Sequence, residues 1–201
     1  HTEAVTSIVG RAELWASFWG MLTILFYVKK QHFYSLLTFL LALWSKEIAV
    51  MILPIILFIE LTKNTKRIQI VLREMILFAM PLGIYAIFRY VALGKYFLSD
   101  VITSTVENPL KFADFSVRIF TSLKILFLYI NKLIWPANLS ADYSYNTIKL
   151  VTNIFGSPHA VMGFVVLILL VALFLFSKTR QTAIGFGAVL FFFPYLMISN
   201  L

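Results

Sequence analysis

Four long apolar runs constrain this chain more than any other feature of its sequence. They cover residues 12–28, 75–93, 160–177 and 182–199, and each is roughly long enough to cross a bilayer core about 30 Å thick. The chain is 61% hydrophobic and 13% charged, whereas soluble domains are about half apolar and about a quarter charged. The sequence therefore predicts an integral membrane protein that folds as an all-α, polytopic bundle of transmembrane helices.

Two shorter apolar runs, residues 33–44 and 48–59, flank the tripeptide Ser45–Glu47. Each would cover roughly 18 Å as a helix. They fit two short or tilted helices that meet at Ser45–Glu47, or one broken helix. The pair is favoured, because a bare Lys and Glu at mid-bilayer would be costly. We expect about six or seven membrane helices in one domain over residues 1–201, with spans at 12–28, 33–44, 48–62, 75–93, 160–177 and 182–199.

The short basic loops predict which side each helix end faces. Residues 29–32, 63–74 and 177–181 are rich in Lys and Arg, and such loops lie in the cytoplasm. Alternation then places the opening helix, Ser45–Glu47 and the long segment 94–159 on the outer side. Within that segment, residues 119–135 could span the membrane, re-enter it or lie in the interface. A spanning helix would break the charge rule, so an interfacial or re-entrant helix is favoured.

Composition also limits the function classes. The net charge of +8 resides in short loops between apolar runs, which indicates membrane topology rather than nucleic-acid binding. The absence of cysteine excludes disulfides, a thiolate metal site and a thiol nucleophile. The chain starts without Met and carries no signal peptide, so we expect it to be a fragment of a longer protein.

Charged side chains at the ends of the apolar runs are the first candidate site residues. The opening helix has a polar half that carries Glu3, Arg11 and Glu13. That half is either a solvated helix face or the polar wall of a water-filled cleft. Lys46 and Glu47 form either a helix turn with a Lys that reaches the headgroups or a point charge for a lipid phosphate.

Two further candidates lie near the outer side. Arg89 fits an interfacial anchor best, with a second phosphate contact as the alternative. Asp142, followed by Tyr143 and Tyr145, is either a solvated loop acid or part of a sugar-handling surface, with rings packed on sugar faces. No nucleotide-binding loop, metalloprotease motif or metal-ligand spacing is visible. Any chemistry must therefore use carboxylates and cations in a membrane cleft.

Four motifs in order carry a family resemblance: HTEAVTSIVGRAELW, SKEIAVMILP, ENPLKFADFSVRIFT…LIWPANLSADYSYNTI and FFPYLMISNL. They are similar to the membrane portion of the transmembrane and tetratricopeptide-repeat-containing protein O-mannosyltransferases and their bacterial relatives. The resemblance implies a GT-C glycosyltransferase fold in the bacterial inner membrane or the endoplasmic reticulum membrane. Such enzymes transfer a sugar from a polyprenyl-phosphate carrier to a Ser or Thr hydroxyl, or to another protein or glycan acceptor.

The resemblance also assigns roles. A carboxylate serves as base toward the acceptor, and cations or a divalent metal offset charge on the leaving phosphate. The motif match carries over six site residues: Glu3, Arg11, Glu13, Lys46, Glu47 and Asp142. Of these, Lys46 and Arg11 are expected to bind the lipid phosphate. Glu3 and Asp142 are expected to bind hydroxyls of the sugar or the acceptor. Three family features are missing: an acidic catalytic motif expected before His1, a polar motif after the closing SNL, and the repeats.

Two other function classes remain open from the sequence. A lipid-carrier transporter or flippase would use the same cations for phosphate but would need no base. A scaffold would use its membrane part only to anchor repeats that bind partners.

Overall fold

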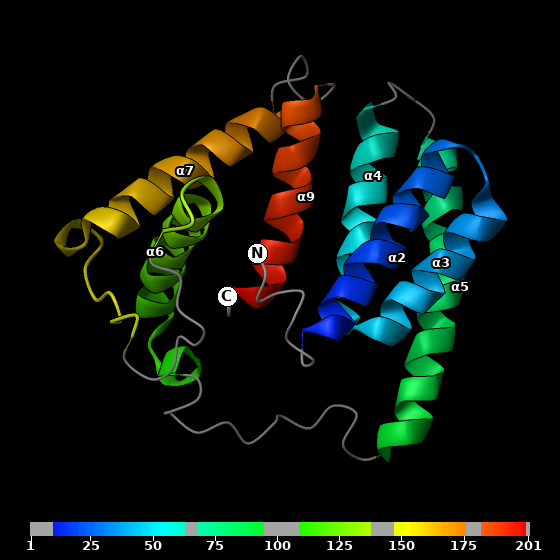
Figure 1. Cartoon of the computed structure of the whole chain (residues 1–201), viewed down its shortest axis with the longest axis horizontal. Helices are drawn as coiled ribbons and strands as arrows, with labels where there is room; N and C mark the ends of the chain where they lie inside the picture. The colour runs from blue at the N-terminus through cyan, green and yellow to red at the C-terminus, as the bar shows by residue number, and fades with distance from the viewer. Residues whose placement is uncertain (1–9, 63–67, 95–108, 138–146, 176–181, 200–201) are drawn as a thin grey trace. The chain divides into compact units, whose positions relative to one another are not determined.

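The computed structural model describes residues 10–62, 68–94, 109–137, 147–175 and 182–199. These residues form helices joined by turns, with no strand among them (Figure 1), so the all-α prediction is confirmed for the described part. The chain divides into two compact units, His1–Asp100 and Val101–Leu201, and each is described by itself. The single membrane domain over residues 1–201 stays a prediction.

Unit 1 contains four described α-helices and one 3₁₀ turn: α2 (Arg11–Val28), α3 (His32–Ser45), η1 (Glu47–Met51), α4 (Ile52–Thr62) and α5 (Ile68–Leu93). The favoured pair of helices around Ser45–Glu47 is present. α3 ends at Ser45, and Lys46 has an extended backbone (φ −161°, ψ 140°) before η1 begins. The extended residue stops the α-helix, because it cannot continue the helical hydrogen-bond ladder.

One predicted boundary is wrong. The basic loop was expected to cover residues 63–74, but residues 68–74 form the first two turns of α5. This segment reads IQIVLRE and holds no Gly or Pro, and Gln, Arg and Glu are good helix formers. The basic residues in this segment therefore did not mark where α5 begins.

α2 and α3 form an antiparallel hairpin held by a buried polar seam. The turn between them places Lys30 in the left-handed region (φ 60°), and its N–H donates to the Tyr27 carbonyl at 2.9 Å. Within the seam, the Thr23 hydroxyl donates to the Thr38 hydroxyl at 3.1 Å, and the Ser35 hydroxyl donates to the Thr23 carbonyl at 2.9 Å. Hydroxyls of this kind commonly join helices that pack in an apolar environment.

α3 and α5 pack in parallel along a ladder of side-chain pairs. Two rungs are aromatic: the ring centroids of Phe39 and Phe78 lie 5.4 Å apart, and those of Trp44 and Phe88 lie 6.1 Å apart. Residue numbers rise together on both helices from rung to rung, which fixes the parallel direction. Phe39 and Phe78 are fully buried, so this seam forms part of the core of unit 1.

Unit 2 contains η3 (Pro109–Phe112), α6 (Phe115–Ile134), η4 (Ile154–Gly156), α7 (Pro158–Leu175) and α9 (Ala183–Ile198). α6 and α7 approach closely at Gly163, where a Cβ would lie only 1.8 Å from the Leu123 carbonyl oxygen. α9 is joined to α6 by hydrogen bonds. The Ser122 hydroxyl donates to the Ser199 carbonyl at 2.7 Å, and the Tyr195 hydroxyl donates to the Ser122 carbonyl.

Two described helices, α5 and α7, are long and apolar enough to cross a membrane, by length and composition. Their best 18-residue windows have mean hydropathies of 1.8 and 2.6, yet only 11% of each window is buried. α5 exposes a series of large apolar side chains: Ile76, Met80, Ile84, Ile87 and Val91. Apolar surface this extensive requires an apolar surrounding, which agrees with membrane localisation.

The finer topology stays a prediction. α2, α3, α4, α7 and α9 coincide closely with predicted spans, but helix positions do not give the number of crossings or a GT-C arrangement. α6 covers residues 119–134 of the predicted segment 119–135 and is not one of the two candidate spans among the described helices. Its interfacial or re-entrant placement, and the outer placement of 94–159, remain expectations.

Candidate functional site

Four predicted site residues come together at one end of unit 1. The Lys46 ammonium contacts the Glu13 carboxylate, which lies 33 residues earlier on α2. The next residue, Glu47, places its carboxylate 3.3 Å from the Arg89 guanidinium on α5. Together with Tyr85, which contacts Arg89, these residues are called the Lys46 cluster below. It joins three parts of the unit that are far apart in sequence.

The break between α3 and η1 explains how consecutive residues reach different helices. The Lys46 N–H still donates to the Ala42 carbonyl at 3.0 Å, so Lys46 closes the last turn of α3. Its extended backbone then sends successive side chains in different directions. Lys46 therefore reaches α2, whereas Glu47 reaches α5.

Arg89 has a second anchor on its own helix. Its guanidinium donates a hydrogen bond to the Tyr85 hydroxyl one turn earlier, and its central carbon lies 5.8 Å from the centroid of the Tyr85 ring. A guanidinium at this distance from a ring face is attracted by the ring electrons. Tyr85 therefore orients Arg89 independently of Glu47.

The Glu47 carboxylate is held in its charged form. Its pKa lies below the ordinary value chiefly because the carboxylate accepts a hydrogen bond from its own backbone N–H. Burial raises the pKa and opposes this effect, whereas the charge and hydrogen bond of Arg89 and the charge of Lys46 lower it further. Glu47 is therefore an anion at neutral pH.

All four charged side chains of the Lys46 cluster are open to solvent. Their exposed fractions are 63% for Glu13, 36% for Lys46, 54% for Glu47 and 35% for Arg89. Ion pairs this exposed contribute little to folding. They remain accessible to a charged ligand.

The other predicted site residues are placed less closely. Arg11 is the exposed first residue of α2, two positions before Glu13. Four residues lie outside the described part of the chain: Glu3, Asp142, Tyr143 and Tyr145. The roles predicted for them stay predictions.

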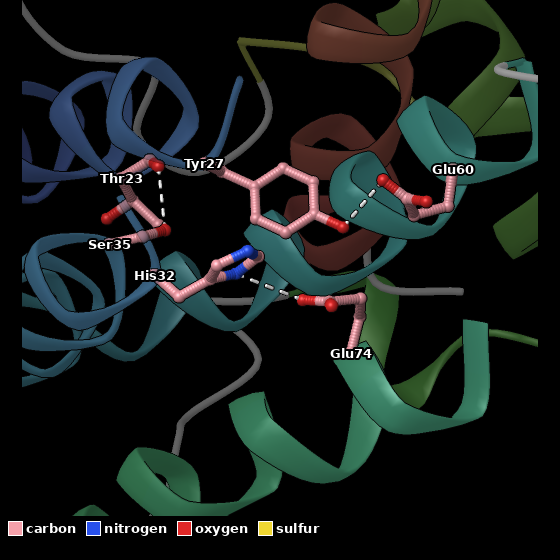
Figure 2. Close-up of polar contacts among 6 residues, drawn as sticks. All are labelled: Thr23, Tyr27, His32, Ser35, Glu60 and Glu74. Atoms are coloured by element: carbon pink, nitrogen blue, oxygen red, sulfur yellow. Dashed lines mark hydrogen bonds and ion pairs between the residues drawn. The ribbon is translucent and has the colours of Figure 1, made fainter. Parts of the chain in front are cut away.

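A second polar cluster, which the sequence did not predict, lies at the opposite end of unit 1. The Tyr27 hydroxyl on α2 donates to Glu60 Oε1 on α4 at 2.7 Å, and His32 Nδ1 at the start of α3 lies 3.3 Å from Glu74 Oε2 on α5 (Figure 2). We call these four residues the Glu74 cluster. Both acids are only 4% exposed, and each of the four helices contributes one member.

The buried oxygen of the Glu74 carboxylate lies beside His32 without a well-directed hydrogen bond. This atom, Oε2, makes no hydrogen bond in the described part of the chain, although it lies within ion-pair distance of His32. One signal for this cluster was present in the sequence. Glu60 follows directly on an apolar run, and an acid in such a place needs a partner.

Among the described residues, no three His, Cys, Asp or Glu side chains gather in a way that could hold a metal ion. The divalent metal that the resemblance leaves open stays a prediction.

Comparison with known families gives one match. The family model described as Protein O-mannosyl-transferase TMTC, DUF1736 matches residues 102–171, all within unit 2. Comparisons with curated proteins and with solved structures gave no significant match.

The matched segment includes the motif over residues 107–148 that carried part of the resemblance, whereas the Lys46 cluster lies in unit 1. The match and the cluster are therefore independent observations. The first supports the family suspected from the sequence, because residues 102–171 are similar to the model described as Protein O-mannosyl-transferase TMTC, DUF1736.

Proposed function

We propose that this chain is part of a membrane glycosyltransferase that transfers a sugar from a polyprenyl-phosphate carrier to a hydroxyl acceptor. Mannose is the sugar that the matched family name favours. The acceptor is a protein Ser or Thr, or another protein or glycan hydroxyl. The reaction takes place at the outer or lumenal face of a bacterial inner membrane or an endoplasmic reticulum membrane.

The Lys46 cluster is the observation that carries this proposal. α3 and α5 both start at the end of unit 1 that holds the basic turn at residues 29–31 and the exposed Arg73, and both finish at the Lys46 cluster. Because basic segments favour the cytoplasmic side, the cluster is expected on the outer side. Two accessible cations there suit the phosphate of a lipid carrier.

The proposed chemistry explains why cations are needed. The acceptor oxygen bonds to the anomeric carbon and gives its proton to a carboxylate base. The bond from the anomeric carbon to the phosphate oxygen breaks, and its electron pair stays on that oxygen. The phosphate thereby changes from a diester with one negative charge to a monoester with two. Cations placed at this oxygen stabilise the transition state more than the ground state.

Lys46 and Arg89 are assigned to the leaving phosphate, with Arg11 nearby on α2 as a third cation. Ammonium and guanidinium groups donate several hydrogen bonds and accept none, which suits them to phosphate oxygens. The hydroxyl-binding roles of Glu3 and Asp142 belong to the same proposal and rest on the resemblance. The sugar contacts of the Tyr143 and Tyr145 rings rest on their position in the sequence shortly after Asp142.

The test measures sugar transfer by the intact protein in lipid nanodiscs. The donor is radiolabelled polyprenyl-phosphate mannose, and the acceptor is a Ser- and Thr-rich peptide. Lys46→Gln and Arg89→Gln should each lower kcat by about 10²-fold, the scale for loss of one group that stabilises transition-state charge. Lys29→Gln, which removes an exposed cation from the other end of α2, should leave kcat unchanged.

Two results would overturn the proposal in different ways. Unchanged turnover in Lys46→Gln and Arg89→Gln would remove the Lys46 cluster from the site. Binding of the polyprenyl-phosphate sugar without transfer to any hydroxyl acceptor would favour a carrier transporter instead, because a transporter needs the phosphate contacts but no base.

A further inference from the structure

The Lys46 cluster balances its own charge. It contains two cations, Lys46 and Arg89, and each contacts one carboxylate, Glu13 and Glu47 respectively. A phosphate that approaches these cations therefore meets sites that already hold an anion. The same arrangement that marks the cluster as a phosphate site also reduces its attraction for phosphate.

The two ion pairs are accessible enough to exchange partners. All four side chains are at least a third exposed, and exposed pairs gain little from each other because water and salt screen them. A carboxylate that leaves its cation can be solvated where it stands. Replacement of a carboxylate by a phosphate oxygen therefore needs no unfolding of the helices.

Arg89 keeps a second set of contacts when its carboxylate partner moves away. Its hydrogen bond to the Tyr85 hydroxyl and its position over the Tyr85 ring hold the guanidinium when Glu47 moves away. Glu47 itself stays charged at neutral pH because its own backbone N–H and the neighbouring cations lower its pKa. It therefore competes for Arg89 as an anion whenever no ligand is bound.

We propose that Glu13 and Glu47 are placeholder anions: they occupy Lys46 and Arg89 in the free protein and are displaced by the phosphate group of the polyprenyl carrier. This inference rests on the proposed function and adds a regulatory role: the two carboxylates oppose the binding of the phosphate that the two cations favour. The carboxylates lower the affinity for phosphate, and they keep the two cations neutralised until a phosphate arrives.

The test measures binding of a polyprenyl monophosphate to the intact protein in nanodiscs. Lys46→Gln and Arg89→Gln should weaken binding. Glu47→Gln and Glu13→Gln should tighten it by about two- to five-fold, the range that corresponds to an exposed ion pair. Glu47→Gln should have the larger effect, because Tyr85 keeps Arg89 in place. Asp114→Asn, which removes an exposed acid in unit 2, should have no effect.

A double-mutant cycle separates competition from a structural effect. Glu47→Gln should tighten binding in the unaltered protein but not in the Arg89→Gln background, where no cation is left to release. Inorganic phosphate alone, measured without the lipid, should also bind Glu47→Gln more tightly than the unaltered protein. That result locates the exchange at the phosphate group rather than at the lipid chain.

The outcomes distinguish the two proposals. If Lys46→Gln and Arg89→Gln weaken binding but the Glu→Gln variants weaken it or leave it unchanged, the placeholder role is overturned and the phosphate site stands. Equal affinity of both proteins for inorganic phosphate also overturns the placeholder role. If no cation variant changes binding, the phosphate site fails and the placeholder role fails with it.

Discussion

The two ends of unit 1 use charge in opposite ways. The Lys46 cluster is exposed, and its acids pair with full cations. The Glu74 cluster buries its two acids almost completely and pairs them with a phenol and an imidazole. Exposed ion pairs are weak and exchangeable, whereas breaking a contact to a buried acid leaves a group that water cannot reach. One end is therefore suited to ligand binding and the other to holding the helices together.

The two ends are also linked through the helices. Glu74 and Arg89 both lie on α5, 15 residues apart in the numbering, which is about 22 Å along a helix. The aromatic rungs at Phe39–Phe78 and Trp44–Phe88 lie between them. The Glu74 cluster and the rungs thus fix the register in which α5 presents Arg89 to Glu47.

Loss of the Tyr27 hydroxyl should give the largest stability effect. Tyr27→Phe removes the donor to the Glu60 carboxylate, and Glu60 is only 4% exposed. We expect a loss of about 2 kcal/mol in the free energy of unfolding, in the range for a hydrogen bond to a charged group. Chemical denaturation in detergent micelles measures it. A loss below about 0.5 kcal/mol would show that the Glu74 cluster does not hold the helices.

Neutralising Glu74 should cost less. In Glu74→Gln the His32 contact loses its charge, but His32 is 40% exposed and the contact is not a well-directed hydrogen bond. We expect a loss of about 1 kcal/mol in the free energy of unfolding, which the same denaturation experiment measures. A larger loss than in Tyr27→Phe would reverse the order of the two contacts within the cluster.

The cation variants of the Lys46 cluster should hardly change stability. Lys46→Gln and Arg89→Gln remove exposed ion pairs, each expected to contribute no more than about 1 kcal/mol. Thermal unfolding of both variants should stay close to that of the unaltered protein. A marked loss of stability in either variant would mean that the Lys46 cluster is also structural, and the contrast between the two ends would disappear.

A change of pH near neutrality should have the smallest effect on the competition between Glu47 and the phosphate. Because the pKa of Glu47 is lowered in the folded protein, its ion-pair contribution is present above the ordinary Glu pKa, near 4.3, and is lost as the pH falls through the lower folded value. The ratio of polyprenyl monophosphate affinities between Glu47→Gln and the unaltered protein should therefore stay constant between about pH 6 and pH 8. A ratio that changes across this window would assign the competition to another group.

The sequence predicted the positions of the helices better than the contacts between their side chains. Long apolar runs mark α7 and α9 because burial in lipid demands length and apolarity at every position. Lys46, Glu47 and Arg89 were singled out because charge at the edge of such runs is costly without a purpose. The pairing of Glu13 with Lys46 and of Glu47 with Arg89 depends on how α2 and α5 pack against α3, and no local pattern encodes it.

The Glu74 cluster escaped prediction for a different reason. Glu74 stands at the end of a basic segment that reads as a loop, so its burial depended on the two extra turns of α5. Tyr27 and His32 flank the turn Lys29–Gln31. The basic residues of this turn indicate topology, but they do not indicate which helices Tyr27 and His32 contact.

The most direct test of the account compares one variant from each end in two measurements. Polyprenyl monophosphate affinity and the free energy of unfolding are determined for the Lys46→Gln/Arg89→Gln double variant and for Tyr27→Phe. We predict that the double variant loses affinity and keeps most of its stability, while Tyr27→Phe loses stability and, below its unfolding transition, keeps its affinity. Unchanged affinity in the double variant would contradict the central claim that the Lys46 cluster binds the carrier phosphate.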